Sequence, residues 1–332
     1  MSEEGGNLGP GTSALIGSLP HQSIDDAIRA QRVAGIDLLT LPELITTDPA
    51  ELMLPRALRA LPEVSFDALG AITVDPQLVG HDLPSSNSWL SQNERAFLTH
   101  PLTQQAGAIK VQTVGPVTAA QALIHAGVPP EDALIRARDA TAARVQALTV
   151  AAEHYCPDAT RLIMLDEPSL ATSACDPAQV EIHADLISGV LHRASKSSLT
   201  GIHTCGNLGL DVAFAAGCDV LTVLPTPDVF ERLGSIIRHT EAGGMLAWGV
   251  VPTSGPLAVQ MDLAWDGLVR LWCELANRGA DPLLLRTQAL ITPECGLGRH
   301  RTDAAEQLLT FVGEIQGRVR DQVVATRLSL GA

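Results

Sequence analysis

Short runs of Val, Ile, Leu and Thr alternate along the chain with longer stretches in which apolar residues recur at helical spacing. This alternation is typical of βα units arranged around a parallel sheet. Eight runs predict strands, at 13–18, 37–43, 109–116, 161–168, 199–205, 219–225, 245–251 and 289–295. Because eight βα units close a barrel, we expect an α/β fold of the (β/α)8 TIM-barrel class, with one catalytic domain over residues 13–332.

The segments between these runs show helix signals. Ser23 followed by Asp26 predicts a helix start, Gly35 predicts the end of that helix, and residues 129–155 form a long pattern rich in Ala, Arg and Leu. The stretch 62–107 is too long for a simple loop and predicts a hairpin or a lid. Residues 1–12 are rich in Gly and acidic side chains, and we expect them to be flexible.

A doubly wound open sheet is the rival fold. It favours a glycine-rich phosphate turn after an early strand, and the sequence contains neither GxGxxG nor GxxxxGK[ST]. The barrel is therefore the preferred interpretation.

The amino-acid composition and net charge limit the classes of molecule that the chain can bind. The 332 residues are 46% hydrophobic and carry a formal net charge of −15, with no long Lys/Arg run. An acidic chain without a basic patch does not suit nucleic acid or an anionic membrane. No run reaches membrane-span length and the N-terminus does not resemble a signal peptide, so we expect a cytoplasmic protein whose partners are small molecules or other subunits.

Six cysteines in a chain of this length show no dense disulfide framework. Cys218 and Cys273 lie within apolar patterns, which predicts that they are small core residues.

A candidate metal set lies at predicted strand ends. His203 and Cys205 alternate along one strand and so face the same side, and Cys295 ends the last strand near the same barrel mouth. One imidazole and two thiolates are zinc-type donors that leave a fourth position open for a substrate thiol. The alternative, a core histidine with two buried cysteines, has about equal weight from spacing alone.

Polar groups at other strand ends complete the candidate site. Asp166 and Glu167 are adjacent, so only one faces inward; that one suits a substrate ammonium, while the other caps a helix or pairs with an arginine. The turn at Gly17 and Ser18 offers N–H groups and a hydroxyl to a carboxylate, although it is also an ordinary strand-to-helix turn.

Five motifs in this order, ALIGSLPH, VQTVGPVT, LDEPSL, GIHTCGN and ITPECGLG, resemble the C-terminal catalytic barrel of cobalamin-independent methionine synthase, in a short single-barrel form. The resemblance implies a superfamily shared with uroporphyrinogen decarboxylase and a Zn²⁺ ion on His203, Cys205 and Cys295 that activates homocysteine for methylation to methionine. It assigns homocysteine contacts to five further residues, which are Ile16, Gly17, Ser18, Asp166 and Glu43.

Three departures from that family affect the expected reaction. Leu224 stands where the family has a glutamate ligand to zinc, which leaves three protein ligands unless Asp228 substitutes. Ala122 replaces a tryptophan that stacks on folate, and Ser254 stands near the position of the family's acid. We therefore expect a methylcorrinoid, bound to a protein, as methyl donor rather than methyltetrahydrofolate. The alternatives are another zinc-thiol alkyltransferase, acting on coenzyme M or a related thiol, and a non-catalytic barrel that interacts with a corrinoid protein.

Overall fold

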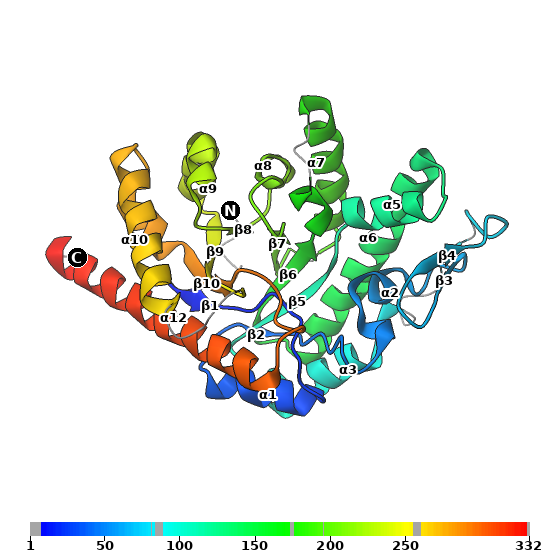
Figure 1. The fold of residues 1–332 in the computed structure, drawn as a ribbon, viewed down its shortest axis with the longest axis horizontal. Coiled ribbons are helices and arrows are strands. Elements are labelled where there is room, and N and C mark those ends of the chain that lie inside the picture. The colour runs from blue at the N-terminus through cyan, green and yellow to red at the C-terminus, as the bar shows by residue number, and fades with distance from the viewer. Residues whose placement is uncertain are drawn as a thin grey trace.

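The computed structural model describes residues 8–80, 82–83, 89–172, 176–194, 196–254 and 260–330. All eight predicted strands are present, and they form one curled parallel sheet in the order β1-β10-β9-β8-β7-β6-β5-β2 (Figure 1). The strands are β1 (Thr12–Ser13), β2 (Leu39–Thr40), β5 (Ala108–Val114), β6 (Thr160–Asp166), β7 (Leu199–His203), β8 (Val220–Val223), β9 (Met245–Val251) and β10 (Ala289–Pro293).

Helices lie on the outer side of the curled sheet (Figure 1). They are α1 (Ile24–Val33), α2 (Met53–Leu58), α3 (Gln92–Thr99), α4 (Pro101–Gln104), α5 (Pro116–His125), α6 (Pro130–Tyr155), α7 (Pro177–Leu191), α8 (Leu210–Ala216), α9 (Leu233–Glu241), α10 (Gln260–Asn277), α11 (Pro282–Thr287) and α12 (Thr302–Leu330). Short 3-10 turns cover Pro49–Glu51, Pro168–Ala171 and Pro227–Arg232. In the described part of the chain, no helix is both long enough and apolar enough to cross a membrane.

The two edge strands of the sheet lie next to each other. The regular parts of β1 and β2 are short, because a side chain takes the place of a backbone acceptor between them. The N–H of Leu15 donates to Thr40 Oγ1 at 3.1 Å. Backbone hydrogen bonds run from Leu38 N to the Ser13 oxygen (3.0 Å) and from Glu43 N to the Gly17 oxygen (3.1 Å). The first and second predicted strands are therefore joined.

The predicted helix signals are confirmed. The side chain of Ser23 accepts from the N–H of Asp26 and caps α1. Gly35, with φ of +73°, follows the C-cap of that helix, a conformation that glycine adopts without steric cost. The long helix predicted over 129–155 is α6.

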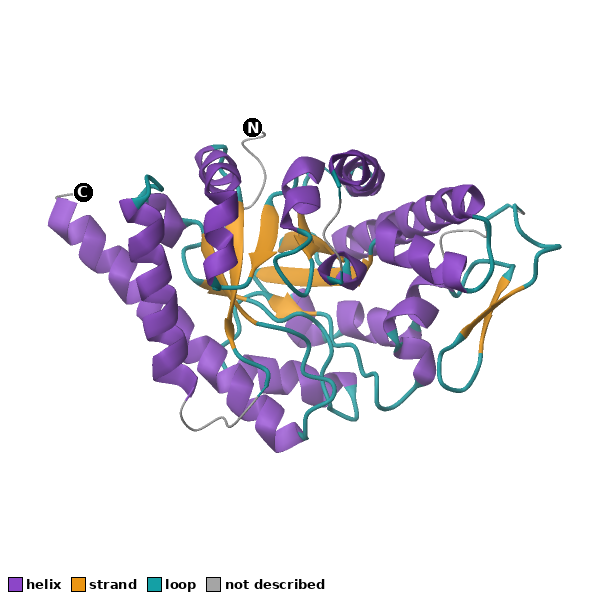
Figure 2. Ribbon diagram, turned by 45° about the horizontal axis from the view of Figure 1, so that its top comes forward, coloured by secondary structure: helices purple, strands orange, loops and turns teal. Residues whose placement is uncertain are grey.

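The stretch 62–107 contains the predicted hairpin, formed by β3 (Val64–Phe66) and β4 (Ile72–Val74), followed by α3 and α4. The hairpin packs its apolar side chains beside α2, α5 and α6 at one end of the molecule (Figure 2). Glu63, which precedes β3, forms a bidentate ion pair with Arg136 of α6. Its Oε1 accepts from Arg136 Nε at 2.5 Å and its Oε2 accepts from Arg136 Nη2 at 2.8 Å.

The N-terminus and one cysteine differ from expectation. Residues 1–7 of the predicted flexible segment 1–12 lie outside the described residues; Leu8 is buried and β1 begins at Thr12. The prediction of a core position for Cys273 is wrong, because α10 is amphipathic and buries Trp272 and Leu275 while Cys273 is exposed. Cys218 is partly buried.

Candidate functional site

His203 and Cys205 lie at the carboxyl end of β7. His203 is buried, and its Nδ1 lies 3.0 Å from Thr222 Oγ1 on β8, a contact that fixes the ring and directs Nε2 toward Cys205 Sγ at 3.1 Å. Cys205 has φ of +52°, in the left-handed region that residues other than glycine rarely adopt. Such local strain is typical of functional positions.

Cys295 follows β10 and meets this pair. Its side chain hydrogen-bonds to both Cys205 and His203, although β10 and β7 are not neighbours in the sheet. The hydrogen bonds from the Cys205 thiol and from His203 lower the pKa of Cys295. The same bond, together with burial, raises the pKa of Cys205. The structure therefore brings together all three residues predicted as zinc ligands.

The distance between the His203 nitrogen and the Cys205 sulfur is that of a hydrogen bond between the two side chains. A tetrahedral zinc ion with ordinary Zn–N and Zn–S bonds would separate the imidazole nitrogen and the sulfur by about 3.6 Å. The separation of 3.1 Å between His203 and Cys205 is shorter. Among the described residues, no group of three or more His, Cys, Asp or Glu side chains has metal-site geometry. One imidazole and two thiols are nevertheless donors of the type that zinc prefers.

Ser18 lies against the turn that bears Cys295. Its carbonyl oxygen accepts from Leu297 N at 2.9 Å, and its hydroxyl accepts from Gly298 N at 3.2 Å. A Cβ at Gly296 would lie 2.2 Å from Ser18 Oγ, so glycine is required for this close approach. The predicted carboxylate-binding turn and the predicted metal ligands are therefore parts of one site.

Glu43 lies beside the same turn, where it forms a parallel bridge with Ser18. Its Oε1 pairs with the buried Arg56 and accepts from Gln112 Nε2 at 2.8 Å. A Cβ on Gly17 would lie 2.2 Å from Gln112 Nε2. Gly17 thus permits the turn to approach Gln112 and Glu43.

Lys110 is a buried cation under this turn. Its Nζ donates to the Ile16 carbonyl oxygen at 2.6 Å and to Gln112 Oε1 at 3.3 Å. Burial lowers the pKa of Lys110 to about 8, against the opposing effect of the Asp166 and Glu43 carboxylates. Lys110 therefore fixes the turn and is a buried positive charge that interacts with the Asp166 and Glu43 carboxylates.

Asp166 and Glu167 face different sides, as their alternation predicts, and Glu167 is the one that caps a helix. Glu167 is fully buried and caps α5, accepting from Val117 N (2.9 Å), Thr118 N (2.7 Å) and Thr118 Oγ1 (2.6 Å). Burial raises the pKa of Glu167 to about 7 despite these hydrogen bonds. A Cβ at Gly115 would lie 2.2 Å from its Oε1.

Asp166 points to the other side, beside His203 across the β6–β7 ladder. It is 3% exposed, and its Oδ1 accepts a hydrogen bond from no described residue. Burial raises the pKa of Asp166 to about 6, and Lys110 and His203 act against that rise. A buried carboxylate oxygen without a donor is costly, and an ammonium group would satisfy it.

The loop after β8 is held by Asn207. Its side chain donates to the Leu224 oxygen at 3.0 Å and to Asp228 Oδ1 at 3.1 Å, and Thr226 Oγ1 also donates to Asp228 Oδ1. Asp228, the proposed substitute for the missing glutamate ligand, therefore uses that oxygen to order its own loop.

A buried ion network beneath the site was not predicted. Arg144 pairs with Glu94, Arg56 lies 3.7 Å from Glu94, and Arg56 pairs with Glu43, so the network reaches the candidate site. A signal for Lys110 and Gln112 does exist in the sequence, because they alternate as polar residues in the otherwise apolar strand IKVQTV. No comparable local signal pairs Arg144 with Glu94, 50 residues away, or Arg56 with Glu43, 13 residues away.

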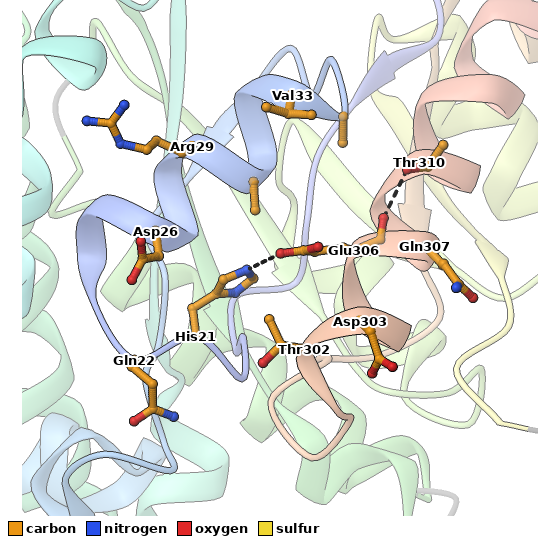
Figure 3. A pocket seen from close by; sticks show the side chains of 12 residues that line it. His21, Gln22, Asp26, Arg29, Val33, Thr302, Asp303, Glu306, Gln307 and Thr310 are labelled. Carbon is orange, nitrogen blue, oxygen red and sulfur yellow. Dashed lines mark hydrogen bonds and ion pairs between the residues drawn. The ribbon is translucent and has the colours of Figure 1, made fainter.

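A groove between α1 and α12 has a volume of about 750 Å³ (Figure 3). His21 lies in it, buried, with Nε2 3.5 Å from Glu306 Oε1. The groove contains none of the residues His203, Cys205, Cys295 or Asp166, so His21 belongs to a different surface from the candidate site.

The chain matches no protein-family model and shows no significant match to a curated protein.

Proposed function

We propose that the chain is a zinc-dependent methyltransferase that methylates the thiol of homocysteine to form methionine, on a closed (β/α)8 barrel. One observation carries the proposal: His203, Cys205 and Cys295 meet beside the turn of Gly17 and Ser18 and near Asp166, whose buried Oδ1 accepts a hydrogen bond from no described residue. The hydrogen bonds that join the first and second strands support the closed barrel.

His203, Cys205 and Cys295 would hold the zinc ion, and the bound ion would lower the pKa of the substrate thiol and keep it as a nucleophilic thiolate at neutral pH. Leu224 contributes no ligand, and the fourth position is therefore left to the substrate sulfur.

The residues of this chain would orient an amino-acid thiol. Asp166 Oδ1 would accept from the substrate ammonium, and Glu43 would add a second negative charge nearby. The turn of Ile16, Gly17 and Ser18, fixed by Lys110, would receive the carboxylate. Opposite charges at the two ends of the site favour a zwitterionic thiol over a sulfonate such as coenzyme M.

The donor that suits this site is a methylcorrinoid. A folate amine is a poor leaving group that needs a positioned acid, and Ser254 and Ala122 supply neither an acid nor an aromatic surface. In a methylcorrinoid the methyl group is bound to cobalt, and the cobalt needs no proton when it leaves the methyl group. We place the reaction in the cytoplasm, where thiols stay reduced.

Metal content and turnover test this proposal together. The purified protein should contain one zinc ion per chain and form methionine from homocysteine with methylcobalamin, and not with methyltetrahydrofolate. Cys295→Ser should lose both properties, whereas Cys273→Ser, which removes an exposed cysteine on α10, should keep them. Zinc without any response to thiols would instead indicate a non-catalytic, corrinoid-interacting barrel.

A further inference from the structure

The groove between α1 and α12, with a volume of about 750 Å³, is separate from the candidate site (Figure 3). This volume is within the range of sites that bind small molecules. His21, which precedes α1, and Thr302, the first residue of α12, are part of its lining. The groove is therefore a second place for a ligand, outside the residues assigned to methyl transfer.

His21 is a buried polar side chain in this groove. It is 3% exposed, and neither of its ring nitrogens has a hydrogen-bond partner among the described residues. Its Nε2 lies 3.5 Å from Oε1 of Glu306 on α12, and Figure 3 shows the ring directed across the groove toward that carboxylate. A buried ring nitrogen without a hydrogen bond is costly, and a ligand that donates to Nε2 would remove that cost.

The charged groups of the groove favour a cation. The lining contains three carboxylates and one guanidinium, which belong to Asp26, Asp303, Glu306 and Arg29. Arg29 donates two hydrogen bonds to Asp25, at 2.7 and 3.1 Å, and Asp303 pairs with Arg301, so both of these charges are compensated. The charge that remains in the groove is negative and attracts a positively charged ligand.

We propose that this groove is a binding site for a small organic cation that carries a primary ammonium group on a short alkyl chain. The ammonium group donates to His21 Nε2 and to Glu306 Oε1, which lie 3.5 Å apart. An ammonium nitrogen about 2.9 Å from both atoms makes two hydrogen bonds with angles of about 150° at the hydrogens, which is ordinary hydrogen-bond geometry. One ammonium group therefore matches the spacing of the two acceptors.

The α1 side of the groove supplies the apolar contact. Ala30, Val33 and Ala34 line it, and Val33 is 89% exposed. An alkyl chain that lies on these residues covers apolar surface that water otherwise contacts, which is favourable. The inference does not rest on the proposed methyl transfer, because the groove and the candidate site share none of the residues His203, Cys205, Cys295 or Asp166.

The test is calorimetric titration of the full-length protein with pentylammonium chloride, with 1-pentanol as the uncharged control. We expect saturable one-to-one binding of pentylammonium, and binding of pentanol at least about tenfold weaker. Glu306→Gln should weaken pentylammonium binding about tenfold. Glu314→Gln, which neutralises an exposed carboxylate of α12 outside the groove, should leave it unchanged. His21→Phe, which keeps a ring without an acceptor nitrogen, should weaken it by a factor similar to that of Glu306→Gln.

Absence of saturable binding, or equal effects of Glu306→Gln and Glu314→Gln, would overturn the proposal. Asp166→Asn separates the inference from the proposed function, because Asp166 is the group expected to hold an ammonium in the candidate site. Loss of pentylammonium binding in Asp166→Asn but not in Glu306→Gln would place the amine in the candidate site and refute the inference. If His21→Phe does not fold, Glu306→Gln still provides the comparison, since the Glu306 side chain is 56% exposed. A protein that binds pentylammonium in the groove but holds no zinc would refute the proposed function alone.

Discussion

Gly115 is a position where adding one methyl group should disturb the framework of the site. Its backbone has φ of −84° and ψ of 170°, an ordinary extended conformation, so Gly115→Ala introduces no backbone strain. The new Cβ would nevertheless lie 2.2, 2.5 and 2.8 Å from Oε1, Cδ and Cγ of Glu167. The Glu167 side chain must move, because three of its own heavy atoms lie inside contact distance.

The size of the effect follows from what Glu167 does. It accepts three hydrogen bonds at 2.6 to 2.9 Å from the first turn of α5. Loss of a helix cap costs about 1 kcal/mol, and each hydrogen bond to a charged group contributes about 1.5–3 kcal/mol. We expect Gly115→Ala to lower the free energy of unfolding by about 3 kcal/mol, which for a chain of this size lowers Tm by about 4 °C.

Thermal and denaturant unfolding measure this change. Gly189→Ala is the matched control, because Gly189 lies inside α7 with no atom near the added Cβ, and it should be stabilising by about 0.5–1 kcal/mol. In a Glu167→Ala background the cost of Gly115→Ala should largely disappear. An equal cost in both backgrounds, or no cost in the wild type, would refute the reasoning.

Three further predictions concern buried charges. Because burial lowers the pKa of Lys110 from 10.5 to about 8, the unfolded chain binds more protons between these values, so the free energy of unfolding should rise from pH 8 to pH 10.5. Lys110→Met should remove up to about 3 kcal/mol of this rise in denaturant titrations at the two pH values, and an unchanged slope would contradict the assignment. Glu63→Ala should cost about 3 kcal/mol because it removes the bidentate carboxylate partner of the buried Arg136, whereas Glu63→Leu combined with Arg136→Leu should cost less by the same titration. Asp166→Asn should weaken homocysteine binding at least about tenfold in calorimetry and leave 4-mercaptobutanoate, which lacks the amino group, unaffected; equal losses for both ligands would show that Asp166 has another role.

The sheet could be predicted from the sequence because each strand carries its own signal. The seven-residue run of β9 is apolar over its whole length, and the alternation of such runs with helical patterns predicts the parallel sheet. The lengths of β1 and β2 could not be predicted, because Thr40 replaces a backbone acceptor through its side chain.

Part of the candidate site could likewise be predicted from the sequence, and part could not. His203, Cys205 and Cys295 could be predicted to meet, since all three follow strands whose carboxyl ends share one edge. The partners of Glu43 and the free oxygen of Asp166 depend on packing between distant segments, and such contacts leave no local pattern.

X-ray absorption at the zinc edge tests the central claim most directly, because it reports the atoms bound to the metal. The account predicts one nitrogen and two sulfur ligands from the protein, with a third sulfur appearing when homocysteine is added. A zinc-loaded protein whose spectrum shows no sulfur ligands, or whose sulfur count does not change with homocysteine, would contradict it.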